Sequence, residues 1–298
     1  MSIITHKVCP GCSSVAIEQK LIAEDFTVSH QQFEIWECNT CSLRFTQHIP
    51  DAGSIGSFYQ SDTYISHTDT KEGIINKLYH IVRKRTIIRK VALVQAVTGK
   101  QTGAVLDIGA GTGAFAHAMQ QAGWQVTGLE PDAATRQRSK ELYGLSLQPT
   151  EGLFALPAAG FDAITLWHVL EHVHELQAYV QQFKKLLKPG GKLLVAVPNY
   201  TSHDAAVYKQ YWAAYDVPRH LYHFSPASMQ QLLQQHGLLL QQHRPMWFDS
   251  FYVAMLSEQY KRGRNGLVSA VWTGFVSNLV TVFNKKRCSS LIYIAGAS

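Results

Sequence analysis

The spacing of apolar residues changes repeatedly after residue 103, from short continuous runs to the three- and four-residue spacing of helices. The continuous runs predict buried strands at 104–108, 125–129, 162–167, 192–197, 238–243 and 290–294, with a further short strand near Leu145. Ser225 followed by Pro226 predicts the start of one helix, and Gly237 predicts its end. Strands that alternate with helices form a parallel sheet with right-handed crossovers. The pattern therefore predicts one α/β domain over residues 101–298.

The first hundred residues follow a different pattern. Two short runs with strand-like spacing, 16–22 and 32–37, lie between two Cys-x-x-Cys pairs. A segment rich in Gly, Ser and Asp follows, and residues 74–97 have helical spacing with a basic face. We therefore expect a small module over 1–48 and a linker with a helix over 49–100 before the α/β domain.

Composition and charge narrow the class of protein. The chain has 298 residues, of which 46% are apolar and 16% charged, as in a folded enzyme of ordinary size. The N-terminus shows no secretory signal and no run is long enough to span a membrane, so the cytoplasm is the expected location. The net charge of +6 is concentrated in 261–287, which contains six basic residues and no acid. The rest of the chain is balanced, which disfavours a broad nucleic-acid surface.

A glycine-rich turn joins the first strand of the domain to its first helix. Gly109, Gly111 and Gly113 leave out the Cβ atoms that would keep a ligand away from the backbone. Asp107 precedes the turn, and Glu130 follows about twenty residues later, where an acid that binds ribose hydroxyls is expected. Asp107 would repel the pyrophosphate of a dinucleotide but attract the ammonium and sulfonium of S-adenosylmethionine. The turn therefore favours S-adenosylmethionine over NAD, and a purely structural turn is the alternative.

These residues, the run 161–167 with His168-Val-Leu-Glu171-His172, and the run 187–195 resemble the ordered motifs of class I S-adenosylmethionine-dependent methyltransferases. The resemblance covers about residues 100–200 and is closest to the broad group that includes the ubiquinone-biosynthesis O-methyltransferases. It implies a Rossmann-like, doubly wound α/β sheet that is parallel with a final antiparallel strand.

The resemblance also implies a set of cofactor-binding residues. In the family's pattern the glycine turn lines the methionine side of the cofactor, Glu130 holds the ribose, and the residues after the fourth strand face the sulfonium. The implied residues are Asp107, Gly109, Gly111, Gly113, Glu130, Glu151, Trp167 and His168. Glu151, the nearest acid to the adenine position, is the least distinct of them.

A second segment, 211–225, combines aromatic and charged residues between a predicted strand and a predicted helix, where α/β proteins carry substrate chemistry. It resembles a recurrent segment of bacterial methyltransferases that carry a similar N-terminal zinc module. We predict Trp212, Arg219 and Tyr222 as substrate-binding residues, with closure of the core as the alternative role of the aromatics.

Methyl transfer to an oxygen requires a base, because a hydroxyl nucleophile must lose its proton, and histidine titrates in the right range. The predicted bases are His220, His223 and His168. His172 is a further candidate, although it follows an apolar helical run where a packed or capping role is equally expected.

Four of the five cysteines form two knuckles, Cys9-Pro-Gly-Cys12 and Cys38-Asn-Thr-Cys41. Two such pairs can complete a tetrahedron of thiolates around one metal ion, and no ligand position then remains for catalysis. We therefore predict a structural zinc-ribbon-like site, with iron as the other metal that such ligands accept and reduced thiols or a disulfide as alternatives.

The residues 266–283 form the last helical stretch, within a predicted helical insertion at about 252–287. Large apolar residues recur along it every four positions, and basic clusters stand at both ends. One interpretation packs the apolar stripe on the domain. The other places the helix in the interface of a membrane at its cytoplasmic side, with the basic residues of 261–287 on anionic lipids.

Three functions fit these observations. The first is methyl transfer to a small-molecule or carrier-linked acceptor on a lipid or sugar, with O-methylation as one form. The second, methylation of nucleic acid through the zinc ribbon, is disfavoured because residues 1–48 contain few Lys or Arg. The third is a module that binds S-adenosylmethionine without catalysis. The acceptor and the oligomeric state stay open.

Overall fold

The computed structural model describes residues 2–59, 74–263 and 266–297. Two parts of the sequence interpretation lie outside the described residues: most of the Gly-, Ser- and Asp-rich segment after residue 50, and Arg264 of the basic cluster.

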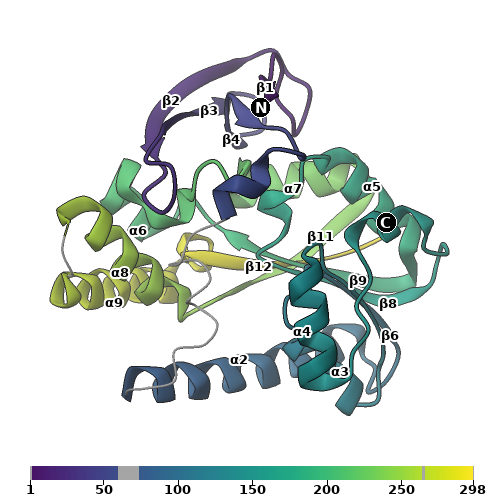
Figure 1. The fold of residues 1–298 in the computed structure, drawn as a ribbon. Coiled ribbons are helices and arrows are strands. Elements are labelled where there is room, and N and C mark those ends of the chain that lie inside the picture. The colour runs from purple at the N-terminus through teal and green to yellow at the C-terminus, as the bar shows by residue number, and fades with distance from the viewer. Residues whose placement is uncertain (1, 60–73, 264–265, 298) are drawn as a thin grey trace.

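A six-stranded sheet occupies the centre of the molecule in the order β11-β12-β9-β8-β6-β7 (Figure 1). Its strands are β6 (Ala104–Ile108), β7 (Gln125–Leu129), β8 (Phe161–Trp167), β9 (Leu187–Pro198), β11 (Leu238–Pro245) and β12 (Ser290–Ala297). The strands β7, β6, β8 and β9 pair in parallel, whereas β12 runs antiparallel to both β9 and β11. The predicted sheet with an antiparallel final strand is confirmed.

Helices cover both faces of this sheet. Alternate residues of each strand point to opposite faces, and both faces carry apolar residues that helices bury. Val105 of β6 packs in a cluster with Val94 and Phe115, whereas its neighbour Leu106 packs in a cluster with Val180. The α-helices are α2 (Ile74–Thr98), α3 (Ala114–Gln121), α4 (Ala133–Tyr143), α5 (Leu176–Leu186), α6 (His203–Tyr208), α7 (Pro226–Gln235), α8 (Asp249–Arg262) and α9 (Leu267–Phe283). Short 3-10 helices lie at Ile55–Tyr59, Thr150–Ala155, Leu170–His172, Lys209–Tyr211, Ala213–Tyr215 and Lys285–Arg287.

The strand predicted near Leu145 is wrong. The segment runs beside β7, but its contact with that strand is a single bridge between Gln148 and Leu129. Pro149 follows at once and has no N–H to donate, and a 3-10 helix begins at Thr150. Leu145 is buried beneath the glycine turn instead, 3.2 Å from where a Cβ on Gly113 would lie.

The N-terminal module contains a four-stranded antiparallel sheet in the order β10-β4-β3-β2, and a small pair β1-β5 (Figure 1). Its strands are β1 (Ile3–Ile4), β2 (Ile17–Glu24), β3 (Gln32–Cys38), β4 (Arg44–Thr46), β5 (Ile49–Pro50) and β10 (Tyr222–His223). The strand β10 belongs to the second signature segment, so the main domain supplies an edge of the module's sheet. Cys9 and Phe45 share one apolar core with Leu221 and Phe224. The module is therefore built into the main domain.

Candidate active site and metal centre

The glycine turn after β6 is shaped by three left-handed residues. Gly109, Gly111 and Gly113 have φ values of 67°, 55° and 82°. A Cβ on Gly109 would lie 2.3 Å from Val169, and one on Gly113 would lie 2.4 Å from Ser139. A Cβ on Gly111 would meet no described atom within 4 Å. The outer glycines thus permit close packing, and the backbone at Gly111 faces open space where a ligand could approach.

Asp107 lies at the end of β6, directly before this turn, and is 1% exposed. Its Oδ1 accepts a hydrogen bond from Thr165 Oγ1 at 2.7 Å. Burial raises the pKa of Asp107 to about 7, although the bond from Thr165 and the charge of Lys90 oppose this rise. A buried acid of this kind is stabilised when a cation binds beside it.

Glu130 follows β7 and reaches back to the turn. Its Oε2 accepts from the N–H of Gly111 at 2.9 Å, and its Oε1 accepts from the N–H of Asp132 at 3.1 Å. Burial raises the pKa of Glu130. Glu151 is exposed in the 3-10 helix that follows Gln148, the residue whose carbonyl accepts from the N–H of Glu130. Asp107 and Glu130 stand at the ends of the parallel neighbours β6 and β7, so their carboxylates lie at the same edge of the sheet.

Lys90 of α2 adds a cation to these acids. Its Nζ lies 4.2 Å from the centroid of the Trp167 ring, and the charges of Asp107 and Asp249 act on it. Burial lowers the pKa of Lys90 to about 8 despite these two acids. The sequence placed Lys90 only on the basic face of the predicted helix 74–97, because nothing in the local pattern shows that α2 packs against the sheet.

His168 follows β8 and adopts a left-handed backbone with φ of 60°. Its Nε2 lies 3.3 Å from Asp249 Oδ2 and its Nδ1 lies 3.5 Å from Glu171 Oε1. Burial lowers the pKa of His168, but the two carboxylates outweigh it and raise the value to about 9. The side chain is therefore protonated at neutral pH, which argues against the predicted role of His168 as a base.

A second cluster lies directly beside His168. Ligand atoms of Glu171, His172 and His220 all lie within 4.8 Å of one another, close enough that they could also hold a metal ion. Glu171 is fully buried, and apart from its ion pair with His168 neither of its carboxylate oxygens has a hydrogen-bond partner among the described residues. Burial raises the pKa of Glu171, but His168, His172 and His220 lower it overall. A buried carboxylate that forms an ion pair with His168 and lies beside two further imidazoles is suited to proton transfer.

The two imidazoles of this cluster are oriented by backbone carbonyls. His220 Nδ1 lies 2.8 Å from the carbonyl oxygen of Ala214, and His172 Nδ1 lies 3.0 Å from that of Arg219. A carbonyl can only accept, so in neutral His220 the hydrogen sits on Nδ1 and the basic lone pair on Nε2, whereas Nδ1 of His172 also lies 3.0 Å from the hydroxyl of Tyr59. Burial and His220 lower the pKa of His172 to about 4, which keeps its ring neutral.

The other predicted residues of the second signature have structural partners. Arg219 is 1% exposed and binds Asp25, Asp216 and the carbonyl of Phe58. Trp212 donates to the buried Asp204, and Tyr222 donates to the carbonyl of His174. These contacts argue against the predicted substrate-binding roles, and the core alternative fits the two aromatics.

His223 is also placed away from substrate chemistry. It pairs with Arg44 across β10 and β4, and its Nε2 lies 3.1 Å from Thr46 Oγ1. Burial lowers the pKa of His223 well below its usual range. The geometry thus separates His223, a part of the module's sheet, from its neighbour His220, a part of the histidine cluster.

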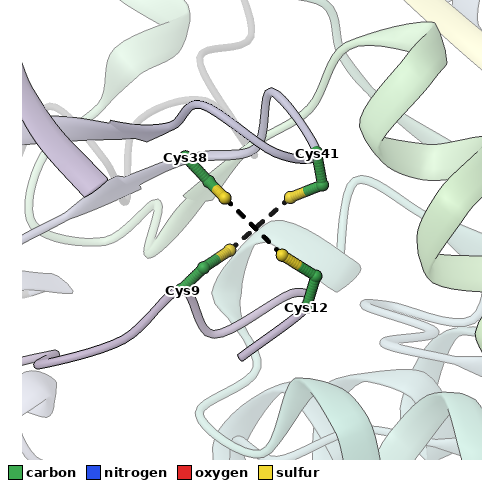
Figure 2. A group of neighbouring side chains, drawn as sticks. All are labelled: Cys9, Cys12, Cys38 and Cys41. Atoms are coloured by element: carbon green, nitrogen blue, oxygen red, sulfur yellow. Dashed lines mark hydrogen bonds between the residues drawn. The ribbon is translucent and has the colours of Figure 1, made fainter. Parts of the chain in front are cut away.

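The four cysteines of the module point toward a common centre (Figure 2). The Sγ atoms of Cys9 and Cys41 are 3.5 Å apart, as are those of Cys12 and Cys38, and all four lie within 4.8 Å of one another. Thiolates bound to a tetrahedral zinc ion are roughly 3.8 Å apart. The N–H groups of Gly11 and Thr40 donate to two of these sulfurs. The donor set therefore fits one zinc ion with four sulfur ligands.

Comparison with known proteins adds to this geometry. A family described as a methyltransferase domain matches residues 79–243. The chain is 32% identical over 158 residues to a ubiquinone biosynthesis O-methyltransferase of Xanthomonas axonopodis pv. citri (strain 306), covering 49% of this chain and 66% of the relative. It is 31% identical over 119 residues to a demethylmenaquinone methyltransferase of Tropheryma whipplei (strain Twist), covering 39% and 50%. The alignments thus span between half and just under two thirds of these relatives.

A solved structure shares the fold. The magnesium protoporphyrin IX methyltransferase of Synechocystis PCC 6803, with SAH bound, superposes with a TM-score of 0.53. The superposition covers 83% of this chain and 100% of that one, at 16% identity. At this identity the likeness concerns the fold alone.

Proposed function

The chain belongs to the methyltransferase domain family, and on this premise we propose that it transfers the methyl group of S-adenosylmethionine to a hydroxyl oxygen of a small-molecule or lipid-linked acceptor. The observation that carries the choice of oxygen is the cluster of buried Glu171 with half-buried His172 and His220. Hydroxyl nucleophiles must lose a proton as they attack, whereas many other methyl acceptors need no base. The relatives named as O-methyltransferases support the same choice.

The acids and Lys90 fit the two ends of the cofactor's amino-acid part. Asp107 would bind the ammonium, and Lys90 would bind the carboxylate, since each lies beside the glycine turn with a charge opposite to its partner. Glu130 would accept from both ribose hydroxyls after exchanging its present bond to Gly111. When bound, the cofactor supplies the electrophilic methyl group.

His220 is the base that this geometry favours. Its Nε2 is the basic atom, and Glu171 beside it would stabilise the imidazolium that forms when the proton arrives. His168 carries its proton already and would act through its charge, and His172 would position the cluster. Alignment of the acceptor oxygen with the methyl group and the sulfur would provide much of the acceleration.

The test is a product analysis with labelled S-adenosylmethionine and acceptors that offer a hydroxyl, an amine or an activated carbon. We expect label on the hydroxyl, and a kcat lowered roughly 100- to 10,000-fold in His220→Gln and Glu171→Gln, with cofactor affinity retained. His30→Gln, a substitution at an exposed histidine of the module, serves as the control. Transfer to nitrogen or carbon, or normal kcat in both variants, would exclude the proposal.

We also propose that the four-cysteine centre holds one structural zinc ion. Elemental analysis of protein purified without chelator should give about one zinc per chain, lost in Cys9→Ser and retained in Cys288→Ser. Cys288 is buried in the main domain, away from the four ligands. Iron in place of zinc would show that the site binds iron, and purified protein free of any metal would overturn the proposed metal site.

A further inference from the structure

The helix α9 has an inverted arrangement of side chains. Its large apolar residues face outward: Leu267, Val268, Val271, Trp272, Phe275, Leu279, Val282 and Phe283 are all exposed. Val268 is 86% exposed, Trp272 66% and Phe283 84%. The residues that α9 buries are small or polar, namely Ala270, Thr273, Gly274, Ser277 and Thr281. The prediction that the apolar stripe packs on the domain is therefore wrong.

The buried side of α9 shows that this orientation is specified. Ser277 donates to the carboxylate of Asp204, which also accepts from Trp212 and Ser289. A Cβ on Gly274 would lie 2.6 Å from the ring of Phe251 in α8, so only glycine permits this approach. A rotation of α9 that hid its apolar face would break the bonds to Asp204 and place bulky side chains against α8. The packing of α9 thus holds the apolar face toward the outside.

Basic residues flank this face. Lys261 and Arg262 end α8, directly before α9, and Lys285 and Lys286 follow α9, all four with exposed side chains. The residues 261–287 contain no acid. The two acids of α8 point elsewhere: Asp249 faces His168, and Glu258 is buried against Tyr208 and Arg262. Apolar residues bordered by cations complement a surface that is apolar within and anionic at its rim.

We propose that the outer face of α9, with the basic residues at its two ends, docks on an anionic lipid bilayer and lies in its interface. No helix among the described residues is long and apolar enough to cross a membrane. The 17 residues of α9 would lie along the bilayer surface, with the rings of Trp272 and Phe275 in the acyl region and the lysines at the headgroups.

The docked helix is connected to the candidate active site. The helix α8 packs against α9 (Figure 1), and Asp249 at the start of α8 binds His168. Bilayer docking would therefore bring the membrane surface close to the histidine cluster. This consequence rests on the proposed function, whereas the docking itself is a binding property that is measured without turnover.

The experiment is co-sedimentation of the full chain with vesicles of phosphatidylcholine alone or mixed with phosphatidylglycerol. We expect binding to the anionic vesicles that weakens as salt is raised. Trp272→Ser with Phe275→Ser should weaken binding at least about tenfold. Lys285→Ala with Lys286→Ala and Arg287→Ala should weaken it roughly 100-fold at low salt.

Matched variants separate this face from general adhesion. Ile22→Ser, an exposed apolar site of the module, and Lys184→Ala with Lys185→Ala, exposed cations of α5, should leave vesicle binding unchanged. No binding to anionic vesicles at low salt overturns the proposal, as does binding that the α9 variants leave intact. A dimer in solution that Trp272→Ser with Phe275→Ser converts to a monomer, without vesicle binding, would assign the face to a second copy instead.

Discussion

Asp107 lowers the stability of the cofactor-free protein, and we propose that it binds the cofactor. Its pKa of about 7 lies above the ordinary value, so folding disfavours its charged form. The cofactor-free protein therefore gains stability as pH falls from about 7 toward 4, because the folded carboxyl keeps a proton that the unfolded chain releases. We predict that Asp107→Asn raises the unfolding temperature more at pH 8 than at pH 5, measured by thermal denaturation without cofactor.

The same substitution should weaken binding of the cofactor. Loss of a charged contact of about 1.5–3 kcal/mol corresponds to roughly 10- to 100-fold in affinity by calorimetry. Glu130→Gln should have an effect of similar size, and Glu141→Gln, an exposed acid of α4, should have none. Unchanged affinity in both Asp107→Asn and Glu130→Gln would remove these two acids from the binding site.

Single residues divide clearly into those that the sequence predicts and those that it does not. Asp107, the glycines and the four cysteines carry their chemistry in a local motif, so their geometry could be predicted. Lys90 and Asp249 reach the site from helices outside these motifs, and no local pattern reports where those helices pack. Conversely, the charged and aromatic segment around Arg219 predicted a substrate-binding role for it. Its partner is instead Asp25, nearly two hundred positions earlier in the chain.

Among the elements, the connection between the module and the segment before β10 depends on one buried cation. Arg219 binds Asp25 after β2 and Asp216 at the end of a 3-10 helix. Arg219→Met would leave the carboxylates of Asp25 and Asp216 without their cation. Loss of one partner of a buried ion pair costs about 3–5 kcal/mol in the free energy of unfolding. We predict a fall of this size in the free energy of unfolding, measured in urea, with the metal content unchanged.

A double-mutant cycle and a surface control complete this test. Asp25→Asn should cost less in the Arg219→Met background than in the natural chain, because the pair is already broken. Arg244→Met, at an exposed arginine of β11, should leave stability nearly unchanged. Equal costs of Asp25→Asn in both backgrounds would show that the two residues are not coupled.

Elements with a local signal were predictable, and elements defined by distant pairing were not. The helix α7 begins at Pro226 after Ser225, and a capping box with Ser228 confirms the predicted start. The strands β4 and β10 have three and two residues, too few for a periodic pattern; β4 is defined by its pairing with β3, and β10 by its pairing with β4. For α9 the apolar period predicted a helix correctly, but the period alone does not say which face is buried.

At the scale of the whole molecule, the module and the α/β sheet form one core. Cys38 and Leu43 belong to the same apolar cluster as Ile164 and Leu193 of the central sheet. We predict that a chelator, by removing the proposed zinc ion, lowers the temperature of a single cooperative unfolding transition, followed by calorimetry and circular dichroism. Cys288→Ser should keep the same response to chelator, and two separate transitions would show that the module unfolds on its own.

The pairing of β4 with β10 also constrains how the chain is made. Thr46 meets His223 across 177 positions, and the ribosome adds roughly 5–20 residues per second, so β4 waits on the order of 9–35 s for its neighbour. During that interval the cysteines can already gather around a metal ion, while the edge of β4 and the carboxylate of Asp25 stay open to other molecules. The module is thus synthesised before the main domain but completed only after residue 223, and nascent chains stalled before residue 219 would present an unprotected strand edge to the cell's chaperones.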